Sequence, residues 1–159
     1  MPSLVKSTIN ILLADDDKDD RELFKEVLDE LPFSFRLETV YDGEQLMQLL
    51  NHANKQLPDV LFLDLNMPRK NGFECFSELR RNENLKKLPV IIFTTSFEPE
   101  VINLLYDKGA QYYIRKPNDY AQLKKVIHLA ITLISQTNLI KPPKEKFVIS
   151  QASFQNEHK

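Results

Sequence analysis

The sequence contains a single cysteine and no long apolar run, and these two absences exclude several classes of protein. One cysteine, Cys75, cannot form an internal disulfide, so a disulfide-stapled secreted domain is excluded and a reducing compartment is expected. No apolar run approaches the roughly 20 residues that a membrane-spanning helix needs. The early apolar run at residues 9–14 ends in three aspartates, which is wrong for a secretory signal peptide. We therefore expect a cytoplasmic protein with no membrane association.

Neither sign of charge dominates the chain. The 21 Lys and Arg residues stand against 23 Asp and Glu residues, which gives a formal net charge of -2. This balance lacks the basic signature of a nucleic-acid-binding protein, so no direct nucleic acid binding is expected. With 159 residues, of which 42% are apolar, the chain is long enough for one domain with a sizeable core.

Glycine is also scarce, and its three occurrences, Gly43, Gly72 and Gly109, fall between the regular elements that the pattern predicts. Apolar runs predict five strands, at residues 9–14, 33–41, 59–64, 90–95 and 111–115. After each strand, apolar residues recur at helical spacing, over residues 23–31, 46–53, 73–79, 101–105 and 123–134. Five strands that alternate with five helices predict a doubly wound α/β fold, with a parallel sheet, right-handed crossovers and helices on both faces.

The stretch from Val60 to Gly72 indicates where a site would lie. Its apolar run leads directly into Asp64, and the Met67-Pro68 pair that follows cannot extend a central strand. Because ligands of open α/β sheets bind at the carboxyl ends of strands, an acid at this point is well placed for a site. Taken alone, Asp64 is explained equally well as a strand cap.

Three consecutive aspartates follow the first strand, and they have two interpretations. Asp17 and Asp20 suit the first turn of the next helix, where carboxylates accept free N–H groups and face the positive end of the helix dipole. Asp15 and Asp16 lie at the strand end, because Ala14 closes the apolar run. Taken alone, such a triplet is more often a helix cap than a metal site.

Polar residues also follow the fourth and fifth strands, namely Thr94 and Thr95 and then Lys116. If the first, third and fourth strands are neighbours, these groups converge with the aspartates on one crevice. Three carboxylates would repel one another unless a cation intervened, and oxygen ligands without nearby His or Cys favour Mg²⁺. Such a site suits phosphoryl transfer to a carboxylate, with the Lys116 ammonium and the Thr94 hydroxyl as donors to phosphoryl oxygens.

Four motifs, in this order, resemble those of the response-regulator receiver domains of two-component signalling. They are the Asp15-Asp16 pair, the L-D-L-N-M-P stretch around Asp64, the threonine after V-I-I-F, and Lys116-Pro117. The resemblance covers about residues 8–137. It implies a flavodoxin-like fold, with a five-stranded parallel sheet in the order 2-1-3-4-5 and five helices, and a receiver domain at residues 1–140.

The resemblance also implies which residues would form the phosphorylation site. Asp64 would be the phosphoacceptor. Asp16 and Asp64 would bind Mg²⁺ directly, Asp15 would bind it through water, and Asn66 would contribute its backbone carbonyl.

Further roles follow for the residues after the fourth and fifth strands. Thr94 matches the family's switch hydroxyl, with Thr95 beside it, and Lys116 matches its phosphate-binding lysine. Tyr113 matches the switch aromatic, which would enter the space that Thr94 leaves when it is drawn toward the phosphoryl group. Receivers commonly have a cis peptide bond at the Lys-Pro position, so Pro117 is a candidate for one.

The implied function is that of a phosphoacceptor rather than an enzyme. A sensor histidine kinase or a histidine phosphotransfer protein would supply the phosphoryl group. A surface made by the fourth helix, fifth strand and fifth helix would then change and bind a downstream protein or a second copy of the chain. Three alternatives stay open: a relay intermediate that passes the group to a histidine phosphotransfer protein, an aspartate-nucleophile phosphohydrolase, and a pseudo-receiver that binds partners without phosphorylation. The phosphohydrolases typically carry a second acid two residues after the nucleophile, where this chain has Asn66.

After the last predicted helix, Pro142-Pro143 ends the regular pattern. Residues 141–159 are too few for an output domain, so the regulator would act by contact. We expect these residues to form a flexible tail. The apolar triplet 147–149 and Phe154 within it could instead dock on the domain or extend an edge of the sheet.

Overall fold

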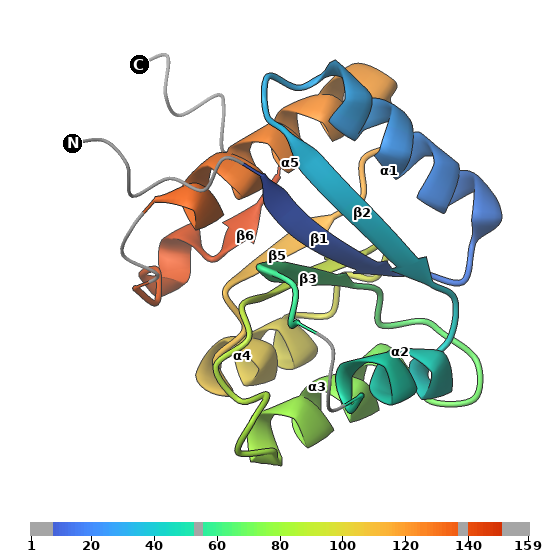
Figure 1. The fold of residues 1–159 in the computed structure, drawn as a ribbon. Coiled ribbons are helices and arrows are strands. Elements are labelled where there is room, and N and C mark those ends of the chain that lie inside the picture. The colour runs from blue at the N-terminus through green and yellow to red at the C-terminus, as the bar shows by residue number, and fades with distance from the viewer. Residues whose placement is uncertain (1–7, 53–55, 137–139, 151–159) are drawn as a thin grey trace.

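The computed structural model describes residues 8–52, 56–136 and 140–150, which form a three-layer α/β fold (Figure 1). The central sheet is parallel throughout and has the order β2-β1-β3-β4-β5-β6. Its strands are β1 (Ile9–Ala14), β2 (Phe35–Val40), β3 (Val60–Leu63), β4 (Val90–Thr94), β5 (Tyr112–Arg115) and β6 (Val148–Ile149). The expected order of the first five strands is therefore confirmed, and a sixth strand is added.

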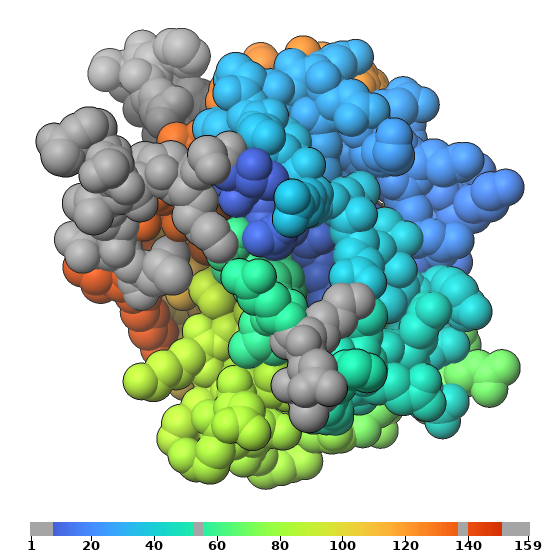
Figure 2. All heavy atoms as spheres, viewed as in Figure 1, coloured from blue at the N-terminus to red at the C-terminus, as the bar shows by residue number. Residues whose placement is uncertain are grey.

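Within the part of the chain that the structure describes, five α-helices cover the two faces of the sheet, as the sequence predicts. They are α1 (Lys18–Glu30), α2 (Gly43–Leu50), α3 (Gly72–Arg81), α4 (Pro99–Asp107) and α5 (Tyr120–Ser135). Helices α1 and α5 lie on one face, and α2, α3 and α4 lie on the other (Figure 1). The space-filling view in Figure 2 shows α2 and α3 adjoining along one border of the molecule. No helix within the described chain is long and apolar enough to cross a membrane.

The inner strands are buried on both sides, which explains their nearly continuous apolar runs. All four residues of β3 and all five of β4 are buried. Successive side chains of a strand point to opposite faces. In β3, Leu61 and Leu63 accordingly join the core under α2, α3 and α4, while Val60 and Phe62 join the core under α1 and α5. This burial fixes the register of the strand and hence the position of the acid that follows it.

A sixth strand at the β5 edge corrects the expectation of a five-stranded sheet. Val148 and Ile149 pair with Tyr113 and Ile114 of β5. Just before β6, the carbonyl of Phe147 accepts a hydrogen bond from the Tyr113 N–H at 3.0 Å. A short 3-10 helix, η1 (Lys144–Lys146), leads into the strand.

The expected flexible tail is therefore wrong for the part of residues 141–159 that the structure describes. The Phe147 side chain is only 1% exposed and lies against the rings of Tyr106 and Tyr113, with centroids 5.1 and 6.4 Å away. Burial of this ring and of Ile149 supplies the apolar contact that a mobile tail would lack. Residues 151–159, including Phe154, lie outside the described residues.

The start of α3 lies unusually close to the end of β3. A Cβ atom at Gly72 would lie 2.0 Å from the Asp64 carbonyl oxygen, which leaves room only for glycine. The helix begins with a capping box, in which the Asn71 side chain accepts from the Glu74 N–H and the Glu74 side chain accepts from the Asn71 N–H. The loop after Asp64 is therefore held tightly at both ends.

Candidate functional site

The carboxyl ends of β1 and β3 bring three aspartates together. The two strands pair in parallel, and the Asp64 N–H continues their ladder by donating to the Ala14 carbonyl at 3.0 Å. As a result, carboxylate oxygens of Asp15, Asp16 and Asp64 all lie within 4.8 Å of one another. Asp15 and Asp64 are buried, whereas Asp16 is exposed. The cluster is thus open to solvent on the side of Asp16, and an ion or a small ligand can reach it from there.

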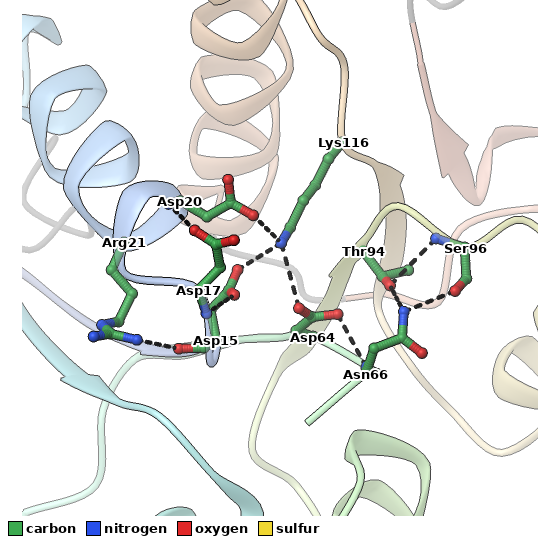
Figure 3. Close-up of polar contacts among 9 residues, drawn as sticks. All are labelled: Asp15, Asp17, Asp20, Arg21, Asp64, Asn66, Thr94, Ser96 and Lys116. Atoms are coloured by element: carbon green, nitrogen blue, oxygen red, sulfur yellow. Dashed lines mark hydrogen bonds and ion pairs between the residues drawn. The ribbon is translucent and has the colours of Figure 1, made fainter. Parts of the chain in front are cut away.

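Lys116 reaches this cluster from the end of β5 and is the positive charge that the structure places there. Its Nζ donates to Asp15 Oδ2 at 2.6 Å, to Asp20 Oδ2 at 2.9 Å and to Asp64 Oδ2 at 3.3 Å (Figure 3). The lysine side chain is only 8% exposed. The ammonium therefore offsets part of the repulsion among the carboxylates.

Burial and pairing shift the ionisation of this cluster in opposite directions. Burial raises the pKa of the Asp15 carboxyl to about 6, although its hydrogen bond with Lys116 works against that rise. Burial by itself would lower the pKa of Lys116, but its bond to Asp15 and the charges of Asp15 and Asp64 outweigh it, and the pKa is raised. Lys116 accordingly stays an ammonium at neutral pH and can donate to an anionic group.

Thr94, at the end of β4, faces the site, whereas its neighbour Thr95 does not. The Thr94 side chain is fully buried, and its Oγ1 accepts from Asn66 Nδ2 at 3.3 Å and from the Ser96 N–H at 3.4 Å (Figure 3). Asn66 Nδ2 also donates to Ser96 Oγ at 2.9 Å. Thr95 lies exposed in the bend after β4. Of the two hydroxyls that the sequence offered, the structure thus brings Thr94 to the site.

Tyr113 lies in the interior rather than at the surface. Its side chain is 0% exposed, and its hydroxyl donates to the Ser96 carbonyl at 2.6 Å. The ring lies between those of Phe97 and Phe147, at centroid distances of 6.5 and 6.4 Å. The expected inward movement would therefore start from a ring that is already buried, because the two flanking rings and the Ser96 carbonyl hold it there.

The proposed cis peptide bond at Pro117 is wrong. None of the peptide bonds in the described chain is cis, so the Lys116–Pro117 bond is trans. Even before proline, trans is the form of lower energy. The Lys116 N–H donates to the Thr94 carbonyl at 2.8 Å, which continues the β4–β5 pairing up to the proline.

The donor set fits a divalent cation with a preference for oxygen. The cluster offers one oxygen from each of three aspartates. Cys75, the one cysteine of the chain, belongs to α3 and is buried in the core. Hard carboxylate oxygens suit Mg²⁺, Mn²⁺ or Ca²⁺ better than softer metals. Asn66 donates its backbone N–H to Asp64 Oδ1 at 3.1 Å, so its backbone lies next to the acceptor, and its carbonyl as a metal ligand stays a prediction.

Sequence reasoning missed two residues of the site. Asp20 was assigned only to the start of α1, yet its carboxylate contacts Lys116, which is 96 residues away in the sequence. Ser96, two residues after Thr94, contacts Asn66 with its hydroxyl and Tyr113 with its carbonyl. A signal existed for Asp20, because a residue in the first turn of α1 lies near the end of β1. The sequence alone gave no signal for Ser96.

Comparisons with known proteins agree with this geometry. The family model described as response regulator receiver domain matches residues 11–128. Response regulator Rcp1 of Synechocystis sp. is 32% identical over 121 residues, which cover 74% of this chain and 82% of Rcp1. The phosphorylated cyanobacterial phytochrome response regulator RcpA is similar in structure, with a TM-score of 0.76, 31% identity, and coverage of 82% of this chain and 96% of RcpA. The Mn²⁺-bound form of Rcp1 gives a TM-score of 0.74 at 29% identity and covers 85% of this chain and 99% of that one.

The matched residues extend from β1 into α5 and contain Asp15, Asp16, Asp64, Thr94 and Lys116. The match to the family model spans more than half of the chain, and Rcp1 exceeds 30% identity over most of its own length. The chain therefore belongs to the response regulator receiver domains of two-component signalling.

Proposed function

We propose that Asp64 accepts a phosphoryl group from a histidine kinase or a histidine phosphotransfer protein and that the reaction requires Mg²⁺. The observation that carries this proposal is the convergence on Asp64 of two further aspartates, both from the turn after β1, and of one buried ammonium from the end of β5. A carboxylate can serve as the nucleophile. Fixed positive charge stabilises the negative charge on the oxygens of the transferred phosphoryl group.

The transfer is a substitution at phosphorus. One Asp64 carboxylate oxygen forms the new O–P bond as the P–N bond of the donor's phosphohistidine breaks. The electron pair stays on the imidazole nitrogen, which then takes a proton from solvent. Lys116, whose Nζ already lies 3.3 Å from Asp64 Oδ2, donates to a phosphoryl oxygen once the group arrives.

Mg²⁺ would be held by Asp15, Asp16 and Asp64, with the backbone carbonyl of Asn66 as a further ligand. It would neutralise negative charge on the carboxylates and the phosphoryl oxygens. Asp15 is buried and has a raised pKa, so a cation also stabilises the ionised form of this carboxyl. Asp16 is the exposed member of the cluster, so the ion and the phosphoryl donor would reach the site on its side.

Phosphorylation would change a surface by way of Thr94 and Tyr113. Thr94 Oγ1 accepts weak bonds of 3.3 and 3.4 Å from Asn66 and Ser96, and these are easily exchanged for a bond that the hydroxyl donates to a phosphoryl oxygen. The Ser96 carbonyl also accepts a hydrogen bond from the Tyr113 hydroxyl, so a movement of Ser96 would move Tyr113 as well. The ring of Tyr113 packs against Phe97 and Phe147. The surface that responds is therefore made by α4, β5, α5 and the β6 segment, and it would bind a downstream protein or a second copy of the chain.

A phosphoacceptor is favoured over a hydrolytic enzyme by the residue two positions after Asp64. Asn66 has an amide that cannot act as a general acid, and its nitrogen donates to Thr94 and Ser96. Slow self-dephosphorylation is the only turnover we expect. The receiver could still pass its group onward to a histidine phosphotransfer protein, since the site chemistry is the same in either direction.

The direct test is incubation with acetyl phosphate and Mg²⁺, followed by intact-mass measurement. The wild type should gain the mass of one phosphoryl group, and chelation of Mg²⁺ should abolish the gain. Asp64→Asn should gain none, because the amide is not a nucleophile. An equal gain in Asp64→Asn would contradict the proposal.

The physiological donor needs a kinase. RcpA is a phytochrome response regulator, so a phytochrome-linked histidine kinase is a reasonable first donor to test. A cytoplasmic location also belongs to this proposal. Size-exclusion chromatography with and without beryllofluoride, which mimics a phosphoryl group, would test the homodimer, and an unchanged elution volume would remove it.

A further inference from the structure

Asp20 makes a contact that the proposed phosphoryl transfer does not use. It lies in the first turn of α1, and its Oδ2 accepts from Lys116 Nζ at 2.9 Å (Figure 3). Its backbone N–H donates to the Asp17 side chain at 3.0 Å, which forms the helix cap. Because the cap uses the Asp17 carboxylate, the Asp20 carboxylate is not needed to begin the helix. It is free to act on the lysine.

The three donors of the Lys116 ammonium are all in use. An ammonium has three N–H groups and no acceptor. Nζ contacts one oxygen each of Asp15, Asp20 and Asp64, at 2.6, 2.9 and 3.3 Å. A phosphoryl group on Asp64 presents three oxygens, so closer engagement of Lys116 with that group requires a donor that is already committed.

Exposure decides which carboxylate can release its donor. The Asp15 side chain is 0% exposed, and leaving it without its cation would strand a buried charge, which is costly. The Asp20 side chain is 34% exposed, so water can replace the lysine there at little cost. Asp20 is therefore the partner that Lys116 gives up when it turns toward a phosphoryl oxygen.

We propose that Asp20 is a positioning residue that holds Lys116 toward α1 in the resting site and competes with the phosphoryl group for the ammonium. This inference rests on the proposed phosphorylation of Asp64. It implies that Asp20 lowers the affinity of the site for a phosphoryl group and thereby favours the unphosphorylated state. Removing its charge should strengthen the interaction between Lys116 and the incoming anion.

The test is beryllofluoride binding at saturating Mg²⁺, which keeps differences in metal affinity out of the comparison. Asp20→Asn should tighten binding by about threefold, the effect of one partly exposed ion pair. Asp19→Asn is the matched control, because Asp19 is exposed in the same helical turn and carries the same charge. The control corrects for the general benefit of removing a negative charge near an anion site, and it should change affinity less than Asp20→Asn does.

A double-mutant cycle with Lys116→Met separates positioning from a structural effect. If Asp20 acts through the ammonium, Asp20→Asn should change affinity in the Lys116→Met background no more than Asp19→Asn does. Equal affinities of Asp20→Asn and Asp19→Asn, weaker binding in Asp20→Asn, or an advantage of Asp20→Asn over Asp19→Asn that persists without the lysine would each overturn the inference. These outcomes leave the proposed function intact as long as the wild type binds beryllofluoride. A wild type that neither binds it nor accepts a phosphoryl group would overturn both.

Discussion

The contact between Phe147 and the domain yields the sharpest structural prediction. Phe147→Ala removes a ring that is 1% exposed and leaves a cavity beside Tyr106 and Tyr113. Truncation of a fully buried Phe to Ala costs about 3 to 5 kcal/mol, since lost burial and the cavity both contribute. Because Phe147 lies at the edge of the sheet, where neighbouring residues can relax, we expect a loss in the free energy of unfolding at the lower end, about 3 kcal/mol. This corresponds to a fall in melting temperature of about 10 °C for a chain of this size.

Urea unfolding followed by circular dichroism measures this change. Ile140→Ala is the matched control, because the Ile140 side chain is 72% exposed and alanine keeps the carbonyl that accepts from Gln111 Nε2 at 3.0 Å. The control should change the free energy of unfolding by less than about 0.5 kcal/mol. If Phe147→Ala also stays within that limit, the segment does not pack against β5, and the expectation of a flexible tail would be restored.

Three further predictions concern the site and the core. The pKa of Asp15, about 6 in the fold against a usual 3.8, means that the folded protein binds this proton more tightly than the unfolded chain. With metal ions removed by a chelator, the protonated Asp15 carboxyl contributes stability below about pH 4, and this contribution is lost as the pH rises through 6. Urea unfolding from pH 4 to 7 measures the loss in free energy of unfolding, and Asp15→Asn should abolish it. Burial raises the pKa of the Cys75 thiol to about 12, so an iodoacetamide reaction at pH 8 should be at least tenfold slower in the native than in the unfolded protein; equal rates would contradict its burial. Gly72→Ala should destabilise the protein and slow phosphorylation, because the new Cβ would lie 2.0 Å from the Asp64 carbonyl oxygen; wild-type rates in the acetyl phosphate assay would contradict that close approach.

Much of the fold follows from local patterns in the sequence. The runs at β3 and β4 are buried on both faces, and such strands give the strongest periodic signal. The polar residues that end those runs also mark the site, because parallel strands bring their carboxyl ends to one edge. That is why Asp64 and Thr94 could be named before their surroundings were known.

The features that sequence reasoning missed depend on contacts between distant parts of the chain. Phe147 belongs to a short apolar triplet in a polar segment, and only the exposed edge of β5 decides that it docks. Asp20 obeys the local rule for a helix start, yet its carboxylate is directed by Lys116. The burial of Tyr113 likewise depends on Phe97 and Phe147, which come from two different segments. Local sequence propensities carry no information about contacts between residues so far apart in the chain.

The measurement that tests the central claim most directly is mapping of the phosphorylated residue. After reaction with acetyl phosphate and Mg²⁺, borohydride reduction converts an aspartyl phosphate to homoserine, which tandem mass spectrometry locates in a peptide. The account predicts homoserine at Asp64 and unmodified aspartate at Asp15 and Asp16. Homoserine at either of those two residues, or at none of the three, would contradict the assignment of Asp64 as the phosphoacceptor.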